Sequence, residues 1–244
     1  MSPENIRLDV LLVDRKLAPS RQRAQALIMA GKVLVNQVPI SKPGTRIRLS
    51  DQVSLKGNDI PFVSRGGIKL AHALSEFDVN PSGQTCMDVG ASTGGFTDCL
   101  LQAGAAKVLA VDVGYGQLAW KLRQDPRVII LERTNIRNLT LEMVPFSIEL
   151  AVIDVSFISL RLVLPVVRTF LVKDAPVVAL IKPQFEVGKG LIGKGGVVRD
   201  PSLHVDVIQS VTQFCAAGGM KVLNVTTSPI TGPKGNKEFL IHLM

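Results

Sequence analysis

The sequence predicts an α/β protein in two parts: a small αβ module, then a doubly wound, mostly parallel sheet with helices on both faces. The main observation is that short apolar segments alternate with helical patterns from residue 85 onward. These predicted strands are 85–89, 107–112, 127–131, 150–154 and 176–181. The second observation is that the preceding residues follow another pattern and are too few to form the whole fold. We therefore expect two domains, residues 1–62 and 63–244.

The end of the chain departs from this alternation. Residues 220–227 and 238–243 are both strand-like, and only the turn from Pro229 to Asn236 separates them. Strands joined by so short a connection form an antiparallel hairpin. We expect the hairpin to add an antiparallel edge strand to the parallel sheet.

The first module begins with two short predicted helices. Leu8, Leu11 and Leu12 have helical spacing within residues 7–17, and Ser20 is a typical N-cap for the next helix. Gly31 is expected to end that helix. Strand-like segments follow at Val33–Val35 and Val53–Leu55, with turns expected at Pro39, Pro43 and Gly44.

Positive charge is concentrated in this first module. The chain has 28 Lys and Arg against 20 Asp and Glu, for a net charge of +8. Residues 1–64 hold ten basic and five acidic side chains, and so supply +5 of that total. Such an asymmetry indicates a polyanionic partner, either nucleic acid or an anionic membrane surface.

The cysteines and histidines show neither a disulfide nor a metal-binding pattern. The three cysteines, Cys86, Cys99 and Cys215, are odd in number and widely spaced. The three histidines, His72, His204 and His242, are isolated from one another as well. We expect no disulfide framework, no metal site and a cytoplasmic, reducing compartment.

No segment of the sequence has the properties of a signal peptide or a membrane span. Charged residues interrupt the N-terminal region. The most apolar stretch, 150–172, contains Asp154, Arg161 and Arg168, so its uncharged runs are shorter than the ~18 residues a span needs. We expect a protein that does not cross a membrane.

A glycine-rich turn, residues 88–95 (DVGASTGG), follows the first predicted strand of the sheet. Its glycines let backbone N–H groups approach a bound nucleotide-type ligand. Ser92 stands where the dinucleotide pattern Gly-x-Gly-x-x-Gly has the glycine that approaches pyrophosphate, which disfavours NAD. S-adenosylmethionine, which has no pyrophosphate, suits the turn better.

Asp112 ends the next predicted strand, 22 residues after Gly90, where a carboxylate can accept hydrogen bonds from ribose hydroxyls. The alternative is that the glycines only make a tight turn and that Asp112 caps a helix. The predicted cofactor-binding residues are Asp88, Gly90, Ala91, Ser92, Thr93, Gly94, Gly95, Phe96, Asp112, Val113 and Asp154.

Asp154 and Lys182 end the fourth and fifth predicted strands, so both should face the cofactor crevice. A lysine whose pKa is lowered can act as general base toward a hydroxyl, although a partly exposed ion pair is the competing interpretation. Residues 155–157 (VSF) lack the Pro-Pro-aromatic pattern of amino-group methyltransferases, and the chain has no Pro-Cys dipeptide for carbon methylation. An oxygen acceptor is favoured.

Residues 188–194 nearly match a phosphate-binding P-loop. The next residue is Gly195, so the hydroxyl that would bind magnesium is missing, and we interpret the match as coincidental. For residues 186–199 a basic lid that contacts phosphates and a merely mobile loop are equally favoured.

Five motifs resemble those of the TlyA (hemolysin A-like) family of ribosomal RNA 2′-O-methyltransferases, whose catalytic domain is Rossmann-like and similar to the FtsJ type. They are residues 64–70 (SRGGIKL), 88–96 (DVGASTGGF), 112–118 (DVGYGQL), 182–190 (KPQFEVGKG) and 235–238 (GNKE). The resemblance covers essentially the whole chain. It implies S-adenosylmethionine as cofactor and a ribose 2′-hydroxyl as methyl acceptor.

The resemblance also implies a catalytic tetrad of Lys69, Asp154, Lys182 and Glu238. In that scheme Lys182 receives the ribose proton, Asp154 and Glu238 position it and tune its charge, and Lys69 holds the substrate. Without the resemblance, Lys69 has the pattern of a solvated helix residue and Glu238 that of an ordinary charge at a strand end.

The first module resembles the RNA-binding domain of the ribosomal-protein-S-four type, at residues 7–9 (RLD), 20–24 (SRQRA) and 31–36 (GKVLVN). Arg7, Arg21, Arg23 and Lys42 are the predicted phosphate contacts; a solvated basic face is the alternative. The resemblance implies ribosomal RNA, in ribosomes or subunits, as partner of a monomer.

The extent of the chain resembles that of the shorter family members. It ends at Met244, directly after the last predicted strand, and begins six residues before Arg7. This favours a cytidine of large-subunit RNA as the target, with the small subunit as a further possibility. Two other functions stay open: a non-catalytic RNA-binding or assembly factor, and a membrane-lytic protein, although we find no amphipathic insertion segment.

Overall fold

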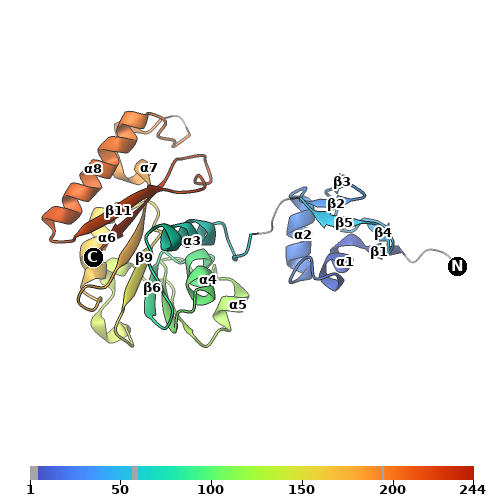
Figure 1. Cartoon of the computed structure of the whole chain (residues 1–244), viewed down its shortest axis with the longest axis horizontal. Helices are drawn as coiled ribbons and strands as arrows, with labels where there is room; N and C mark the ends of the chain where they lie inside the picture. Colours follow the sequence, from blue (N-terminus) through green and yellow to red (C-terminus); the bar gives the residue numbers. More distant parts are fainter. Residues whose placement is uncertain (1–4, 57–59, 194) are drawn as a thin grey trace. The chain divides into compact units, whose positions relative to one another are not determined.

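The structure is a computed structural model that describes residues 5–56, 60–193 and 195–244. It divides into two compact units, Met1–Asp59 and Ile60–Met244 (Figure 1).

The first unit combines two short helices with three-residue strands. Its described elements are β1 (Asn5–Arg7), α1 (Leu8–Asp14), α2 (Arg21–Met29), β2 (Val33–Val35), β3 (Val38–Ile40), β4 (Arg46–Arg48) and β5 (Val53–Leu55). Strands β3, β2 and β5 form an antiparallel sheet, and β1 pairs with β4. Ser20 caps α2 as predicted, because its hydroxyl accepts a hydrogen bond from the N–H of Arg23 at 3.2 Å.

The helices and strands of this unit enclose one small apolar core. Leu8, Leu12 and Ile28 are fully buried in it. The predicted turn at Pro39 is wrong, since Pro39 lies within β3 and pairs with Leu34 of β2. Strand β3 is at the edge of its sheet. A proline, which has no backbone N–H, is tolerated there because an edge strand can face solvent with its N–H side and lose no hydrogen bond between strands.

A seven-stranded sheet forms the centre of the second unit. In spatial order its strands are β11 (Val222–Thr227), β12 (Phe239–Leu243), β10 (Val177–Ile181), β9 (Leu150–Ile153), β6 (Thr85–Val89), β7 (Lys107–Val111) and β8 (Val128–Leu131). Strands β6 to β10 are parallel, whereas β12 is antiparallel to both of its neighbours. The predicted α/β fold with a C-terminal hairpin is confirmed.

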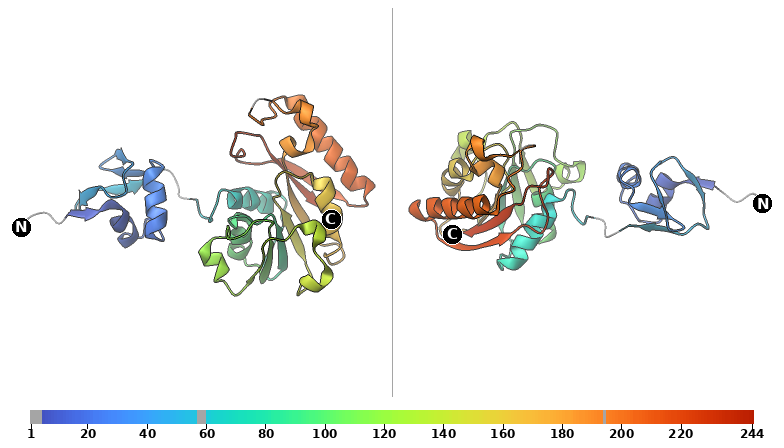
Figure 2. Two further views of the ribbon diagram at one scale, coloured as in Figure 1. Left: turned by 180° about the vertical axis from the view of Figure 1, so that it is seen from behind. Right: turned by 90° about the horizontal axis from the view of Figure 1, so that it is seen from above.

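Helices cover both faces of this sheet (Figure 2). They are α3 (Gly66–Glu76), α4 (Gly95–Gln102), α5 (Trp120–Arg123), α6 (Leu160–Arg168), α7 (Pro183–Glu186) and α8 (Pro201–Ala217). Successive strand residues face opposite layers: Cys86 packs with the α3 and α4 side chains, and Met87 packs with those of α6 and α8. Between β8 and β9 the chain forms only the 3₁₀ turns η1 (Ile136–Asn138) and η2 (Leu141–Met143).

The order of the strands reverses at β6. Strands β7 and β8 lie on one side of β6, and β9 and β10 lie on the other. The connection after β6 leads to α4 on one face, and the connection after β9 leads to α6 on the opposite face. The carboxyl ends of β6 and β9 therefore border a crevice, which is where ligands bind in doubly wound sheets.

Candidate active site

The glycine-rich turn after β6 has little space for side chains. Gly90 has a φ of +87°, and a Cβ there would lie 2.6 Å from the carbonyl oxygen of Asp154. Gly94 has a φ of +92°, and a Cβ there would lie 2.2 Å from the side chain of Leu122. Glycine at position 90 therefore lets the turn pack against the end of β9, and glycine at position 94 lets it pack against Leu122 of α5.

Replacing Gly90 by alanine is expected to lower the free energy of unfolding by about 3 kcal/mol, from the left-handed backbone and the contact with the Asp154 carbonyl together. Gly116→Ala is the matched control, because Gly116 has a φ of +71° and open space around it. The control should lose only the backbone contribution of about 1–2 kcal/mol. Urea unfolding of both variants measures the difference, and equal losses would contradict the role assigned to Gly90.

Asp112, at the end of β7, holds the glycine-rich turn and its own loop together. Its Oδ2 accepts a hydrogen bond from the N–H of Ser92 at 2.7 Å, and its Oδ1 accepts one from the N–H of Gly114 at 2.6 Å. Each carboxylate oxygen has a second acceptor site. Asp112 can therefore accept from a ribose hydroxyl while it keeps both backbone contacts.

Two cavities meet at the glycine-rich turn. The larger has a volume of about 1030 Å³ and extends from Asp112 and Val113 to the residues after β8 and β9. The smaller has a volume of about 260 Å³ and contains Lys69 and Lys182. Both are lined by Gly90, Ser92, Asp154 and Ser156, so a ligand in one cavity can reach a group in the other.

The predicted cofactor residues divide between the two cavities. Besides the residues common to both, Asp112 and Val113 line the larger one. Ala91, Thr93, Gly95 and Phe96 line the smaller one. Asp88 and Gly94 line neither, because Asp88 is buried below the turn and Gly94 faces α5.

Our sequence reasoning missed a further part of the larger cavity. The segment from Thr134 to Arg137, after β8, lines it, as do Phe157, Gln184 and Phe185. Asn135 is the N-cap of η1, and its Oδ1 accepts a hydrogen bond from the backbone N–H of Arg137 at 3.1 Å. The available signal was topological: this segment follows the carboxyl end of the third parallel strand, at the same edge of the sheet as Asp112.

Asp154 and Lys182 lie side by side, as the strand ends predicted. The Lys182 Nζ is 2.7 Å from the Asp154 Oδ1 and donates a hydrogen bond to the Ser156 hydroxyl at 2.9 Å. Asp154 Oδ1 has no aligned hydrogen bond in the structure. The Lys182 Nζ is thus fixed at the wall of the smaller cavity, with a carboxylate oxygen of Asp154 still able to accept a hydrogen bond.

Lys69 and Glu238 form a second, more deeply buried pair. Glu238, directly before β12, accepts a hydrogen bond from the Lys69 Nζ at 2.5 Å. Lys69 is 7% exposed and Glu238 1% exposed. The expectations of a solvated helix residue and an ordinary strand-end charge are therefore wrong. The segment before β12 brings Glu238 to Lys69 of α3. Both charges can be buried because each is the partner of the other.

Asp88 is the most deeply buried carboxyl group near the site. Its Oδ2 accepts the Thr97 hydroxyl at 2.6 Å, and its Oδ1 has no hydrogen-bond partner in the structure. Burial, with smaller contributions from the charges of Asp154 and Asp112, raises the pKa of Asp88 from 3.8 to about 7.

The raised pKa of Asp88 makes stability depend on pH. Between about pH 4 and pH 7 the native state holds this proton and the unfolded state does not, so stability falls as pH rises through that window. Asp88→Asn removes the titration. The unfolding free energy of the variant minus that of the wild type should rise by up to roughly 4 kcal/mol from pH 4 to pH 8. Urea titrations measure it, with exposed Asp174→Asn as control, and a flat difference for Asp88→Asn would contradict the account.

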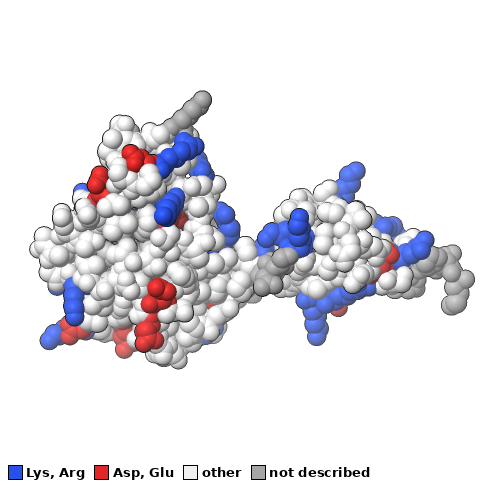
Figure 3. Space-filling model, turned by 45° about the horizontal axis from the view of Figure 1, so that its top comes forward, with Lys and Arg blue, Asp and Glu red and all other residues white. Residues whose placement is uncertain are grey.

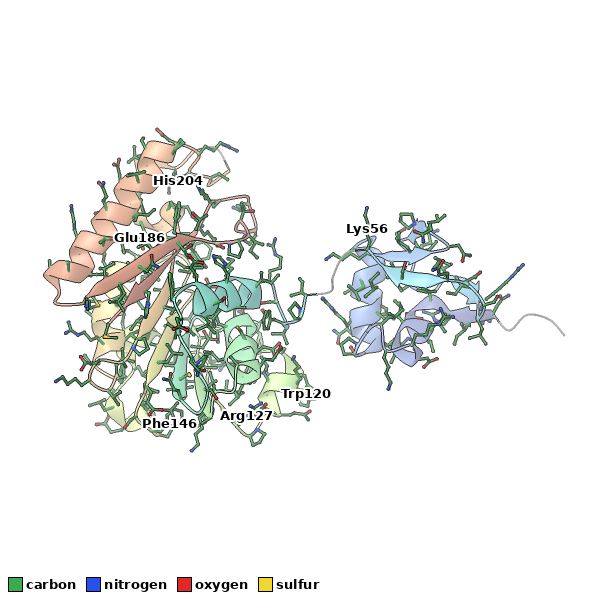
Figure 4. All side chains as sticks on the ribbon, in the orientation of Figure 1. Lys56, Trp120, Arg127, Phe146, Glu186 and His204 are labelled. Carbon is green, nitrogen blue, oxygen red and sulfur yellow. The ribbon has the colours of Figure 1, made fainter. Side chains whose placement is uncertain are left out.

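Both ends of the segment 186–199 are hydrogen-bonded to neighbouring parts of the second unit: the start of α6, the loop before β12 and α8. Glu186 accepts hydrogen bonds from the Ser159 hydroxyl and the Leu160 N–H, at 2.6 and 2.8 Å, and its burial raises its pKa. Asn236 accepts the Val198 N–H at 3.0 Å, and His204 Nε2 lies 3.0 Å from the Val198 carbonyl oxygen. Figure 4 labels Glu186 and His204 beside α7 and α8. A lid function of this segment stays a prediction.

The predicted RNA contacts lie in the first unit. Figure 3 shows basic side chains over its visible face. Lys42 is exposed and Arg23 is partly exposed. Arg7 and Arg21, by contrast, both bond to Asp9, and the hydrogen bond from Arg7 is the main reason that the pKa of Asp9 lies well below its usual range.

The described part of the chain has neither a membrane-spanning helix nor a cluster of metal-binding side chains. Among residues 5–56, 60–193 and 195–244, no helix is long and apolar enough to cross a membrane. Within the same residues, no group of three or more His, Cys, Asp and Glu side chains is arranged to hold a metal ion.

The sheet order, the glycine-rich turn after β6 and the acid after β7 define the second unit as a Rossmann-like methyltransferase domain. The chain belongs to the FtsJ-like methyltransferase family, whose model matches residues 62–244. An S4 domain model matches residues 6–53.

Relatives of known name agree with this assignment. The 16S/23S rRNA (cytidine-2′-O)-methyltransferase TlyA of Mycobacterium tuberculosis is 49% identical over 240 residues, 97% of this chain and 89% of the relative. The 23S rRNA (cytidine-2′-O)-methyltransferase TlyA of Campylobacter jejuni is 36% identical over 80% of this chain and 76% of its own. A solved Streptococcus thermophilus protein that carries the name hemolysin is 45% identical, with a TM-score of 0.77 over 100% of this chain and 89% of its own.

Proposed function

We propose that the protein is an S-adenosylmethionine-dependent methyltransferase that modifies a ribose 2′-hydroxyl of ribosomal RNA. The observation that carries the proposal is the junction of the two cavities. The larger cavity contains Asp112, and the smaller presents Lys182 and Lys69. Gly90 and Ser92 of the glycine-rich turn line both. A methyl donor and a hydroxyl acceptor can meet at the residues common to both.

The residues around the larger cavity fit S-adenosylmethionine. Gly90 lets the turn lie against the backbone of Asp154, and Asp112 keeps free acceptor sites for ribose hydroxyls. The segment from Thr134 to Arg137 and the side chain of Val113 give the cavity both polar and apolar walls. When bound, the cofactor supplies a methyl group attached to a positively charged sulfur. A hydroxyl oxygen can attack the methyl carbon, and the sulfur is then the leaving group.

Lys182 is the group that receives the ribose proton in this proposal. Its Nζ can accept a proton only in the neutral form, and its contacts with Asp154 and Ser156 fix where the nitrogen lies. As the oxygen gains its methyl group, the hydroxyl proton passes to Nζ, and Asp154 stabilises the resulting ammonium ion. Lys69, which Glu238 holds at the wall of the smaller cavity, binds the substrate.

The first unit is proposed to bind the RNA, through Arg7, Arg21, Arg23 and Lys42. Phosphate contacts by such residues supply affinity without reading sequence. The printed names of both methyltransferase relatives include 23S rRNA and cytidine. We therefore propose a cytidine of large-subunit RNA as the target, with the small subunit as a further substrate. The enzyme would act as a monomer in the cytoplasm, where ribosomes are found.

Incubation with radiolabelled S-adenosylmethionine and ribosomal subunits from cells that lack the modification tests this function. We expect label in the RNA of the large subunit, and none when Lys182→Ala replaces the wild type. No label in the RNA of either subunit, or of intact ribosomes, would overturn the proposal. Retention of biological function by Lys182→Ala would instead indicate a non-catalytic factor, and vesicle leakage by that variant at wild-type potency a lytic one.

A further inference from the structure

We infer that Asp9 is a positioning residue for RNA binding: it holds the guanidinium groups of Arg7 and Arg21 so that their outer N–H groups bind the RNA phosphate backbone. This inference rests on the proposed function. It assigns a role in RNA binding to Asp9, a buried residue that does not itself contact the RNA. Asp9 is negatively charged, whereas the groups that bind RNA phosphates are positively charged.

Asp9 lies at the centre of a hydrogen-bonded cluster, and it is 0% exposed. Arg7 forms a bidentate interaction with it: Nε donates to Oδ1 and Nη2 donates to Oδ2, both at 2.9 Å. Arg21 donates from Nε to Oδ2 at 3.0 Å, and Gln25 donates from Nε2 to the same oxygen at 2.9 Å. Because Arg7 and Arg21 share Oδ2, their bonded nitrogens are within about 6 Å of each other.

The two arginines keep donors for a ligand after binding Asp9. A guanidinium group has five N–H bonds, and Arg7 uses two of them and Arg21 one. Their side chains are 41% and 56% exposed, whereas the carboxylate between them is covered. The charged groups that reach the surface are therefore the two arginines, and their planes are already fixed before RNA arrives.

Gly44 supports the same arrangement from another part of the chain. A Cβ at Gly44 would lie 3.2 Å from the Arg7 Nη1, closer than side chains normally pack. The backbone of Gly44 is not in the left-handed region, so its conformation does not require glycine. A side chain at this position would press on the Arg7 guanidinium, and glycine leaves that group its place beside Asp9.

A third arginine lies beside the pair. Arg46 of β4 is the direct cross-strand partner of Arg7 in β1, and it is exposed. Like charges directly opposite each other in antiparallel strands destabilise the pair. Lys42 is exposed in the loop that leads to β4. This concentration of positive charge fits a polyanion, and phosphate oxygens match the fork of a fixed guanidinium.

The decisive variant is Asp9→Asn, for which net charge and positioning predict opposite results. The substitution makes the protein more positive by one unit, which by itself would strengthen RNA binding. If Asp9 positions the arginines, the dissociation constant for large subunits lacking the modification should rise about tenfold. The slope of log Kd against log KCl concentration should also become shallower by about one, since one phosphate contact is lost.

Asp14→Asn is the matched control, because Asp14 is exposed in the same unit and the charge change is identical. It should bind as tightly as the wild type or more tightly. A second variant, Arg21→Lys, keeps the charge and removes the planar fork, and should weaken binding several-fold. If Asp9→Asn does not fold, as thermal unfolding of the full chain would show, Arg21→Lys decides the question.

Two outcomes would overturn the inference: wild-type or tighter binding by folded Asp9→Asn, or unchanged binding by Arg21→Lys. The proposed function fails differently, since the wild type would then methylate no ribosomal RNA. Methylation of saturating RNA by Asp9→Asn should remain at the wild-type rate, because Asp9 lines neither cavity of the candidate active site. A positioning role in RNA binding thus appears as a change in KM with kcat unaltered.

Discussion

Lys182→Arg is expected to lower the turnover number for methyl transfer by about 10²–10⁴-fold, the contribution typical of a general base. Arginine keeps the positive charge and can still pair with Asp154, but it does not give up its proton in proteins. If Lys182 contributed only its positive charge, the rate of methyl transfer would be unchanged by this substitution. Single-turnover methylation of saturating RNA measures the rate.

Two further measurements make the Lys182 result interpretable. Calorimetric affinity for S-adenosylmethionine should stay within a few-fold of the wild type, since Lys182 does not line the larger cavity. Lys173→Arg, at an exposed lysine of the same unit, should leave the rate unchanged. A Lys182→Arg protein with the rate of the Lys173→Arg control would contradict the role of Lys182 as proton acceptor.

Glu238→Ala is expected to be the most destabilising substitution at the site, with a loss of about 3–5 kcal/mol in the free energy of unfolding. The reason is that Lys69 remains buried without its partner. The variant should also lose methyl transfer, because nothing then holds Lys69 at the wall of the smaller cavity. Urea unfolding and the single-turnover rate measure the two effects.

The double variant Lys69→Met/Glu238→Leu separates stability from activity. It removes both buried charges, so most of the lost stability should return, as for other buried pairs replaced by apolar residues. Methyl transfer should stay absent, since no ammonium group remains to bind the substrate. A stable and fully active double variant would show that the pair has no part in the reaction.

The sheet was predictable because its signals are local. Each parallel strand is a short apolar run, and the structure begins β6 at Thr85 and ends it at Val89, as predicted. The glycine-rich turn and Asp112 could be placed because each directly follows a predicted strand. The carboxyl ends of parallel strands in a doubly wound sheet meet at one edge, where ligands bind. Pro39 was misplaced because turn signals cannot distinguish a turn from an edge strand.

The rest of the site depends on contacts between distant residues. Lys69 and Glu238 are 169 positions apart, and neither has a local pattern that indicates burial. Only the family resemblance pointed to them. Asp9 was missed because its carboxylate was counted as part of the net charge, whereas the fold buries it below Arg7 and Arg21. Single-sequence patterns do not show which charges the tertiary structure covers.

The central claim, methyl transfer to a ribose oxygen, is tested most directly by identifying the labelled nucleoside. Large-subunit RNA from the labelling reaction is digested to nucleosides and separated against standards. The account predicts that the label co-elutes with 2′-O-methylcytidine and is absent after reaction with Lys182→Arg. Label in a base-methylated nucleoside, or equal labelling by both proteins, would contradict it.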